Sequence, residues 1–308
     1  MLPEDSGTGR NLAPLLIAIA GHVTRLAGTS DRTRATARLC LMDALTCAFG
    51  ALQDPACTAL LGPVVPGATM AGGARVPGTS YELDPVQAAF NLGMMFRWPG
   101  GASAWTATAW GHPADSLGGI LAVADWLARR AVMEGRPPLT VSEVLTTLIR
   151  ACEIQGAVAE VFGGGGDHGL RARVATAAVV TAMVGGTRAQ RIGAVWQACR
   201  EHGAPQTGIL PRWVAGDASA RGVRLALLAA TAEPGDPPVL SQEAQSVRGV
   251  MEGVLPGFDF PVVAARLASA AATCFGSRQG ERVGALFADP VRLEAMPVTT
   301  FMACLVKN

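Results

Sequence analysis

The amino-acid sequence predicts an all-α protein, and three features of the chain support this prediction. Apolar residues recur at helical spacing in most segments, whereas the strict alternation typical of half-buried strands is almost absent. Half of the 308 residues are hydrophobic and only 16% are charged, so the helices should be apolar around most of their circumference. Helix-start signals precede two of the apolar segments. Such helices suit a deep core or an interface shared between subunits.

The first half of the chain carries two clear helix-start signals. Asp84 is a suitable N-cap, Pro85 fits the first helical turn, and Gln87 is placed to close a capping box. Thr140 and Glu143 form a second capping box. With these signals, the helices expected in this half are 11–27, 31–52, one starting at Asp84, 116–131 and 140–161.

The second half contains the one convincing linker. It runs from Glu233 to Pro238 and is rich in proline and glycine. We therefore divide the chain into residues 1–233, a linker at 234–241, and residues 242–308. The helices expected in the second half are 170–184, 188–200, 217–231, 242–254, 261–274 and 296–306.

Charge and hydropathy exclude several classes of partner. The net charge of +1 gives no electrostatic basis for binding nucleic acid or an anionic membrane. The longest apolar run, from Leu12 to Gly21, is too short to span a bilayer. The acidic start of the chain lacks the basic residues of a signal peptide. We therefore expect a cytoplasmic protein that binds neither nucleic acid nor membrane.

The cysteine and lysine contents narrow the possible chemistry. Seven cysteines are scattered without any CxxC spacing, and their neighbours are apolar. This pattern favours reduced, buried thiols over disulfides or zinc ligands. Lys307 is the only lysine, so chemistry that needs an interior lysine is almost excluded.

A segment from Arg97 to Gly119 is the most informative part of the chain. It joins two apolar helical segments, yet it holds three of the six tryptophans and one of the four histidines, His112. Glycine and proline make its first part a loop, and Pro113 marks the start of the next helix. A loop this rich in aromatic residues between buried helices is typical of the wall of a pocket.

The same region resembles a known family. The motifs that carry the likeness are colinear and run from about residue 31 to 233 and again over roughly the last fifty residues. They resemble the MmgE/PrpD family, whose type member is 2-methylcitrate dehydratase. The motifs are Asp43-Ala44-Leu45, Asp54-Pro55-Ala56-Cys57, Leu61-Gly62-Pro63-Val64-Val65-Pro66-Gly67, Leu83 to Asn91, Arg97-Trp98, Trp110-Gly111-His112-Pro113, Gly118-Gly119-Ile120-Leu121, Glu153-Ile154-Gln155-Gly156, Gly166-Asp167-His168, Trp213 to Ala218, Arg224 to Leu227, and Arg292 to Val298.

This resemblance implies an architecture in which one part is missing. Members of the family have a large helical domain built from both ends of the chain, with a smaller α/β domain inserted between them and the catalytic cleft where the two meet. Here the likeness stops at Glu233 and resumes in material like the family's final helices. We therefore expect a single helical domain, with the linker at 234–241 where the α/β domain would be.

The resemblance also implies that part of the catalytic machinery is absent. The family places an Asp-Phe-x-Asp-Thr motif just after its Arg-Trp pair, and here residues 100–104 read Gly-Gly-Ala-Ser-Ala. A family lysine corresponds to Pro211. Losing one catalytic group typically lowers the rate by about a hundredfold or more. The remaining site should be wider and less charged than that of the family.

Two histidines match family positions and are the candidate acid–base pair. His112 lies in the Gly-His-Pro motif, and we expect it in an exposed loop with a catalytic role. His168 follows Asp167, which either orients its imidazole or merely caps the next helix. We take His112, His168 and Asp167 as the candidate catalytic residues.

Arginines and tryptophans are the candidate substrate-binding residues. Arg97 and Arg212 are the best candidates to hold an anion, although Arg212 reads equally well as a surface arginine. Trp98, Trp105 and Trp110 suit either a core or a pocket that stacks on a conjugated substrate.

Three hypotheses for function follow. The first is a repurposed enzyme that catalyses elimination, isomerisation or cyclisation of a small, relatively apolar metabolite, in specialised biosynthesis. The second is a residual dehydratase of citrate-like acids. The third is a catalytically inert scaffold that pairs with another protein through its apolar helices.

The expected ligands and partners are few. The sequence contains no metal-binding cluster and no nucleotide fingerprint, so we expect no metal and no cofactor. The expected partners are a small-molecule substrate and a second copy of the chain, since the resemblance and the high apolar content both favour a homodimer.

Overall fold

The computed structural model describes residues 12–25, 28–98, 111–162, 168–200, 213–231, 247 and 260–307. Over these residues the protein is almost entirely helical, so the predicted fold class is confirmed. The elements are α1 Ala13–His22, α2 Asp31–Ala51, α3 Pro55–Thr58, β1 Ala74–Arg75, β2 Glu82–Leu83, α4 Pro85–Phe96, α5 Ala114–Met133, α6 Val141–Phe162, α7 His168–Met183, α8 Arg188–Arg200, α9 Val214–Thr231, α10 Phe260–Phe275, α11 Ser277–Ala285, α12 Pro290–Ala295 and α13 Val298–Ala303.

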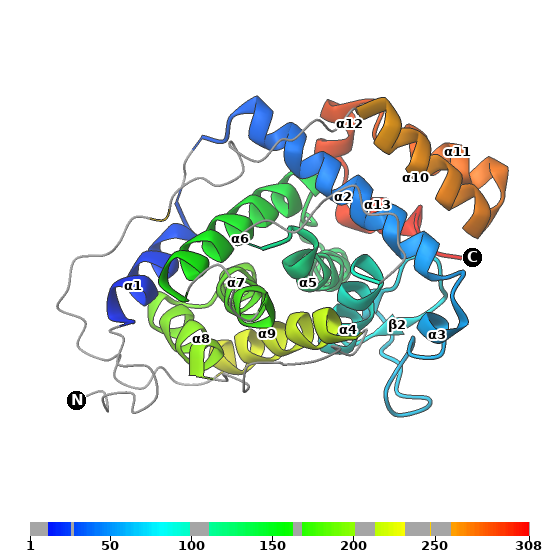
Figure 1. Ribbon diagram of the computed structural model, residues 1–308. Coiled ribbons are helices and arrows are strands. Elements are labelled where there is room, and N and C mark those ends of the chain that lie inside the picture. Colours follow the sequence, from blue (N-terminus) through cyan, green and yellow to red (C-terminus); the bar gives the residue numbers. More distant parts are fainter. Residues whose placement is uncertain are drawn as a thin grey trace.

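Helix α5 lies at the centre of the molecule (Figure 1). It packs against α4, α6, α7 and α9, while α8 and α1 lie beyond α7 on one side. The C-terminal helices lie at the opposite side, where α10 packs on α2, α12 on α6 and α13 on α5. Residues from both ends of the chain therefore contribute to one hydrophobic core.

The helix-start signals are largely confirmed. The Asp84 side chain accepts hydrogen bonds from the backbone N–H groups of Val86 and Gln87. Glu143 Oε2 accepts from the Thr140 backbone N–H at 2.8 Å, which is one of the two bonds of the predicted capping box. The Thr140 hydroxyl donates to the same carboxylate at 3.0 Å. The expected role of Gln87 is wrong, because its side chain donates to Gly62 O at 2.8 Å instead of turning back to Asp84. It thus ties the loop before β1 to the start of α4.

Several predicted boundaries need correction. The structure has a two-residue antiparallel pairing of β1 with β2, which the sequence did not predict. Helix α9 starts at Val214, three residues before the predicted start, so Asp217 lies in its first turn, where it pairs with Arg221. The single helix predicted over 296–306 is α13, and α11 and α12 before it were not predicted. The helix predicted over 242–254 and the linker at 234–241 lie outside the described residues.

Glycines allow α4 and α5 to approach each other closely. A Cβ atom at Gly118 would lie 2.5 Å from the backbone nitrogen of Gly93, which is closer than real side chains come. Because the two helix axes meet here without side chains between them, the end of α4 lies near the start of α5. The residues that follow α4, Arg97 and Trp98, are thereby held close to His112.

The state of the cysteines agrees with the prediction of reduced thiols. All seven cysteines are free thiols, five buried and two half-buried, as predicted. Burial raises the pKa of Cys57 and of Cys199 to about 12, so these thiols stay protonated at neutral pH. Among the described helices, none combines the length and the apolar character needed to cross a bilayer.

A buried ion pair connects three elements, and its loss should destabilise the fold. The fully buried Asp125 on α5 accepts from the Arg75 backbone nitrogen at 2.9 Å, from its Nε at 3.0 Å and from its Nη2 at 2.6 Å. The same Nη2 donates to Thr299 O at 2.8 Å. We predict that Asp125→Ala lowers the free energy of unfolding by about 3–5 kcal/mol, because it leaves Arg75 buried without its counterion. Urea-induced unfolding followed by circular dichroism measures this loss.

Glu134→Ala is the matched control for this substitution. Glu134 also pairs with two arginines, Arg130 and Arg136, but this cluster is exposed. Its removal should leave the urea midpoint almost unchanged. Equal losses for the two variants would show that the buried pair does not hold α5 in place.

Candidate functional site

Three of the eight predicted site residues have described side chains, namely Arg97, Trp98 and His112. His168 is the first residue of α7, but the side chain of His168 lies outside the described part of the chain. The other four predicted site residues, Asp167, Trp105, Trp110 and Arg212, also lie outside it. The predictions for those five residues therefore stay predictions. The structure brings Arg97 and His112 together at the N-terminal end of α5.

His112 is buried, with 2% of its surface exposed, so the expectation of an exposed loop is wrong at this residue. It lies two residues before α5, and its Nδ1 accepts a hydrogen bond from the Ala114 backbone N–H at 3.1 Å. Ala114 is the first residue of the helix, where backbone N–H groups have no partner within the helix. The imidazole therefore serves as the cap of α5.

This hydrogen bond fixes which nitrogen of His112 carries the proton. A nitrogen that accepts from a backbone N–H uses its lone pair and bears no hydrogen. The neutral imidazole is thus protonated on Nε2, and its ring cannot rotate without losing the Ala114 contact. A histidine held in one tautomer and one orientation is suited to directional proton transfer.

The backbone before His112 is shaped by Gly111. Its φ of +141° is a conformation that favours glycine, and a Cβ atom there would lie 2.2 Å from Gln155 Oε1. Gln155 on α6 is fully buried and its Nε2 donates to Ser116 Oγ at 2.9 Å. The absence of a side chain at residue 111 therefore lets the His112 segment pack directly on α6.

Gln155 and Ser116 were missed as candidate site residues. In the described part of the chain, Gln155 Oε1 has no hydrogen-bond partner, although the atom is buried. A buried acceptor of this kind beside a buried histidine is a feature that a substrate hydroxyl would satisfy. The signal in the sequence was a glutamine on the apolar face of this helical segment, at helical spacing from Cys152 and Ala159.

Arg97 forms an ion pair at the same end of α5. Its Nε lies 2.8 Å from Asp115 Oδ1, and the Arg97 side chain is 29% exposed while that of Asp115 is 6% exposed. Asp115 thus orients the Arg97 guanidinium at the N-terminal end of α5, and guanidinium groups are suited to binding carboxylates.

Trp98 is part of the core. The residue is 4% exposed, and its indole Nε1 donates to Asp54 Oδ2 at 2.9 Å. Asp54 also caps α3 through the Ala56 backbone N–H. This arrangement favours a packing role for Trp98 over the predicted contact with substrate, because the indole links the segment after α4 to α3.

Cys152 on α6 is not a nucleophile in this site. Burial raises its pKa well above the ordinary value, and the negative charges of Glu153 and Asp115 raise it further. The thiol therefore stays protonated at neutral pH. Among the described residues, no three side chains of His, Cys, Asp or Glu gather closely enough to hold a metal ion.

These observations define a class of protein: a helical domain with a buried, single-tautomer histidine at a helix N-terminus and an oriented arginine beside it. The family follows from comparison with known sequences. Residues 18–263 match the MmgE/PrpD N-terminal domain, and the chain belongs to this family.

Characterised relatives are similar over most of this chain. The 2-methylcitrate dehydratase of Salmonella typhimurium is 43% identical over 317 residues, covering 94% of this chain and 65% of that protein. The 2-methylcitrate dehydratase of Cupriavidus necator is 49% identical over 237 residues, covering 74% and 49%. The fungal alkylcitrate dehydratase phiI is 37% identical over 241 residues, covering 73% and 48%. The chain thus spans between about half and two thirds of the length of these relatives.

The contact between Gly111 and Gln155 predicts the effect of a single methyl group. Gly111→Ala introduces both an unfavourable φ and a clash with Gln155, so we expect a loss of about 1–3 kcal/mol in the free energy of unfolding. Gly50→Ala is the matched control, because Gly50 lies on α2 and a methyl group added there would meet no other atoms within 4 Å. It should stabilise the protein slightly. If thermal unfolding shows the same midpoint for both variants, Gly111 is not required for packing against α6.

Proposed function

We propose that this chain is a hydro-lyase that dehydrates a citrate-like hydroxy acid. The observation that carries the proposal is the combination of 37–49% identity to 2-methylcitrate and alkylcitrate dehydratases with a buried His112 held in one tautomer. A carboxylate-bearing substrate also agrees with the oriented Arg97 at the same helix end.

The reaction needs one base and one acid. A C–H bond next to a carboxylate breaks, its electron pair becomes the new C=C bond, and the C–O bond to the neighbouring hydroxyl breaks. The base takes the proton, and the acid protonates the departing hydroxyl so that it leaves as water. Both groups must lie within hydrogen-bonding distance of the substrate.

The residues of the site suit parts of this scheme. His112 Nε2–H is the group we assign to hydrogen-bond the departing hydroxyl. A neutral imidazole is too weak an acid to release this proton, so the imidazolium that His168 becomes on taking the C–H proton would pass that proton to the hydroxyl, which leaves as water. Arg97 would hold a carboxylate through its terminal nitrogens, and Gln155 Oε1 would accept a hydrogen bond from the substrate. We assign the role of base to His168, whose imidazole is the second titratable group at a matching family position.

The replaced motif favours a bulkier substrate. Residues 100–104 carry small side chains and no carboxylate, and Pro211 replaces a family lysine. An alkyl-substituted citrate, which has the same three carboxylates as citrate and an added apolar group, is therefore a better candidate than citrate itself. The same replacements support a second candidate function, the elimination, isomerisation or cyclisation of a less charged metabolite in specialised biosynthesis. We include a homodimer in the proposal, since the chain is rich in apolar helices.

The test is turnover of 2-methylcitrate, citrate and an alkylcitrate, followed by the ultraviolet absorbance of the new double bond. His112→Asn is the informative variant, because the Asn amide oxygen can still accept from the Ala114 N–H while the Nε2 proton is lost. We expect this variant to lower kcat by about a hundredfold or more with little change in the midpoint of unfolding. His22→Gln on α1 is the control histidine and should retain the rate.

Each outcome decides between the candidates. Full activity of His112→Asn would show that this histidine takes no part in the reaction. The rate would then come from holding the substrate in a reactive conformation. If none of the three acids is converted, the dehydratase proposal fails, and either the second candidate or a non-catalytic scaffold takes its place.

A further inference from the structure

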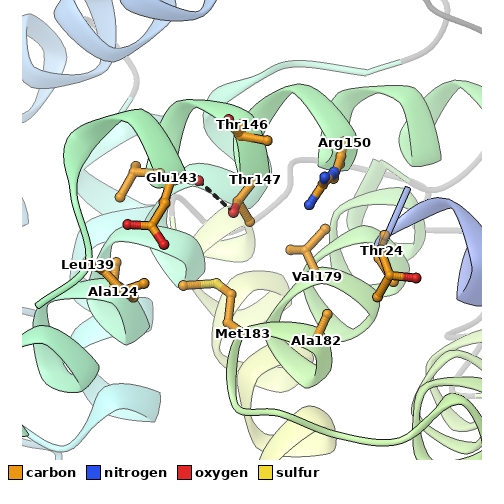
Figure 2. Close-up of a pocket in the computed structure, with 12 residues that line it drawn as sticks. Thr24, Ala124, Leu139, Glu143, Thr146, Thr147, Arg150, Val179, Ala182 and Met183 are labelled. Carbon is orange, nitrogen blue, oxygen red and sulfur yellow. Dashed lines mark hydrogen bonds between the residues drawn. The ribbon is translucent and has the colours of Figure 1, made fainter. Parts of the chain in front are cut away.

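A cavity lies away from His112, between α5, α6, α7 and the end of α1. Its volume is about 490 Å³, within the range of small-molecule sites. Figure 2 shows Arg150 and Thr24 at one end of this cavity and Glu143, Leu139 and Ala124 at the other. We call it the α6–α7 cavity.

The two walls of the α6–α7 cavity differ in character. The α6 wall carries the cationic Arg150, with Thr146 four residues and Thr147 three residues before it. The hydroxyls of both threonines donate to carbonyl oxygens of α6. The α7 wall is apolar and consists of Val179, Ala182 and Met183. The cavity therefore suits a molecule with one polar end and one apolar part.

Arg150 is the feature that selects the charge of that molecule. Its Nη2 donates to the backbone oxygen of Arg25 at 2.7 Å, and within the described residues it forms no ion pair with a carboxylate. Burial lowers its pKa from the ordinary value of arginine, although the group remains charged at any physiological pH. Arg150 is half-buried and has no ion pair among the described residues, so it favours binding of an anion.

The nearest acidic groups are already engaged. Glu153, one turn along α6, lies 2.7 Å from His22 Nε2. Glu143 accepts from the Thr140 backbone nitrogen and hydroxyl at the other end of the cavity. The negative charge of Glu153 acts on Arg150 and partly opposes the effect of burial on its pKa. No ion pair joins the two among the described residues, so the guanidinium can still pair with an incoming anion.

The α6–α7 cavity is distinct from the proposed active site. Its α7 residues Val179 and Met183 lie 11 and 15 residues after His168, or about 16–22 Å along the helix axis. A ligand in this cavity would therefore occupy the opposite end of α7 from the candidate catalytic histidine.

We propose that the α6–α7 cavity binds a free monocarboxylic acid with an alkyl chain of several carbons. The carboxylate pairs with Arg150, and the alkyl chain packs against Val179, Ala182 and Met183. This site is additional to the proposed dehydratase site and does not depend on it.

Isothermal titration calorimetry of the purified chain with sodium octanoate tests the proposal. Saturable binding with a Kd below about 1 mM is expected. Octan-1-ol and inorganic phosphate should bind at least tenfold more weakly, since each lacks one of the two complementary parts. Arg150→Met should weaken octanoate binding by about tenfold or more, and Arg150→Lys by less. Arg278→Gln, an exposed arginine on α11, is the control and should bind as the unaltered chain does.

A second variant guards against a folding defect. Ala182→Phe fills the apolar wall while leaving Arg150 in place, and it should also abolish octanoate binding. His112→Asn should bind octanoate normally, so a loss of turnover and a loss of this site are distinguishable. The proposal is overturned if octanoate does not bind, if octan-1-ol binds as tightly, or if folded Arg150→Met and Ala182→Phe both bind octanoate unchanged.

Discussion

The burial of α5 is the constraint on which the rest of the structure depends. Almost every residue from Ala114 to Asp125 is buried, which requires small side chains and a partner for each polar group. Gly118 lets α4 approach, Asp125 is satisfied by Arg75, and Ser116 by Gln155. The N-terminal end of such a helix would leave buried N–H groups without partners, and the His112 imidazole accepts from one of them. The candidate active site is thus part of what makes α5 stable.

This dual role changes how His112 should be understood. A histidine that only filled the core would not need a fixed tautomer, and one that only performed catalysis would not need to cap a helix. Here the contact with the Ala114 N–H selects the tautomer, so the helix terminus leaves the Nε2–H of the imidazole to donate a hydrogen bond to a substrate. Arg97, oriented by Asp115 in the first turn of α5, adds a cationic group at the same place. The proposed dehydratase chemistry uses both features.

Sequence patterns predicted the helices better than the site. Periodicity and capping residues such as Asp84 and Thr140 act locally, so the helices they start could be placed within a few residues. The short helices α11 and α12 were missed because they hold too few turns for a periodic pattern. The burial of His112 was also missed, since it depends on the distant Gln155 and on the φ of Gly111, which no local pattern reveals. The choice between a core and a substrate-binding role for Trp98 stayed open for the same reason, because its partner Asp54 lies 44 residues away.

The most direct test of the role given to His112 is its tautomer, observed by two-bond ¹H–¹⁵N correlation of the imidazole ring. The sequence contains four histidines, and the His112→Asn variant identifies the signal that disappears. We expect a neutral ring protonated on Nε2, with Nδ1 accepting from the Ala114 N–H. A ring protonated on Nδ1 would contradict this role, because that nitrogen could then neither cap α5 nor leave the Nε2 proton for the departing hydroxyl.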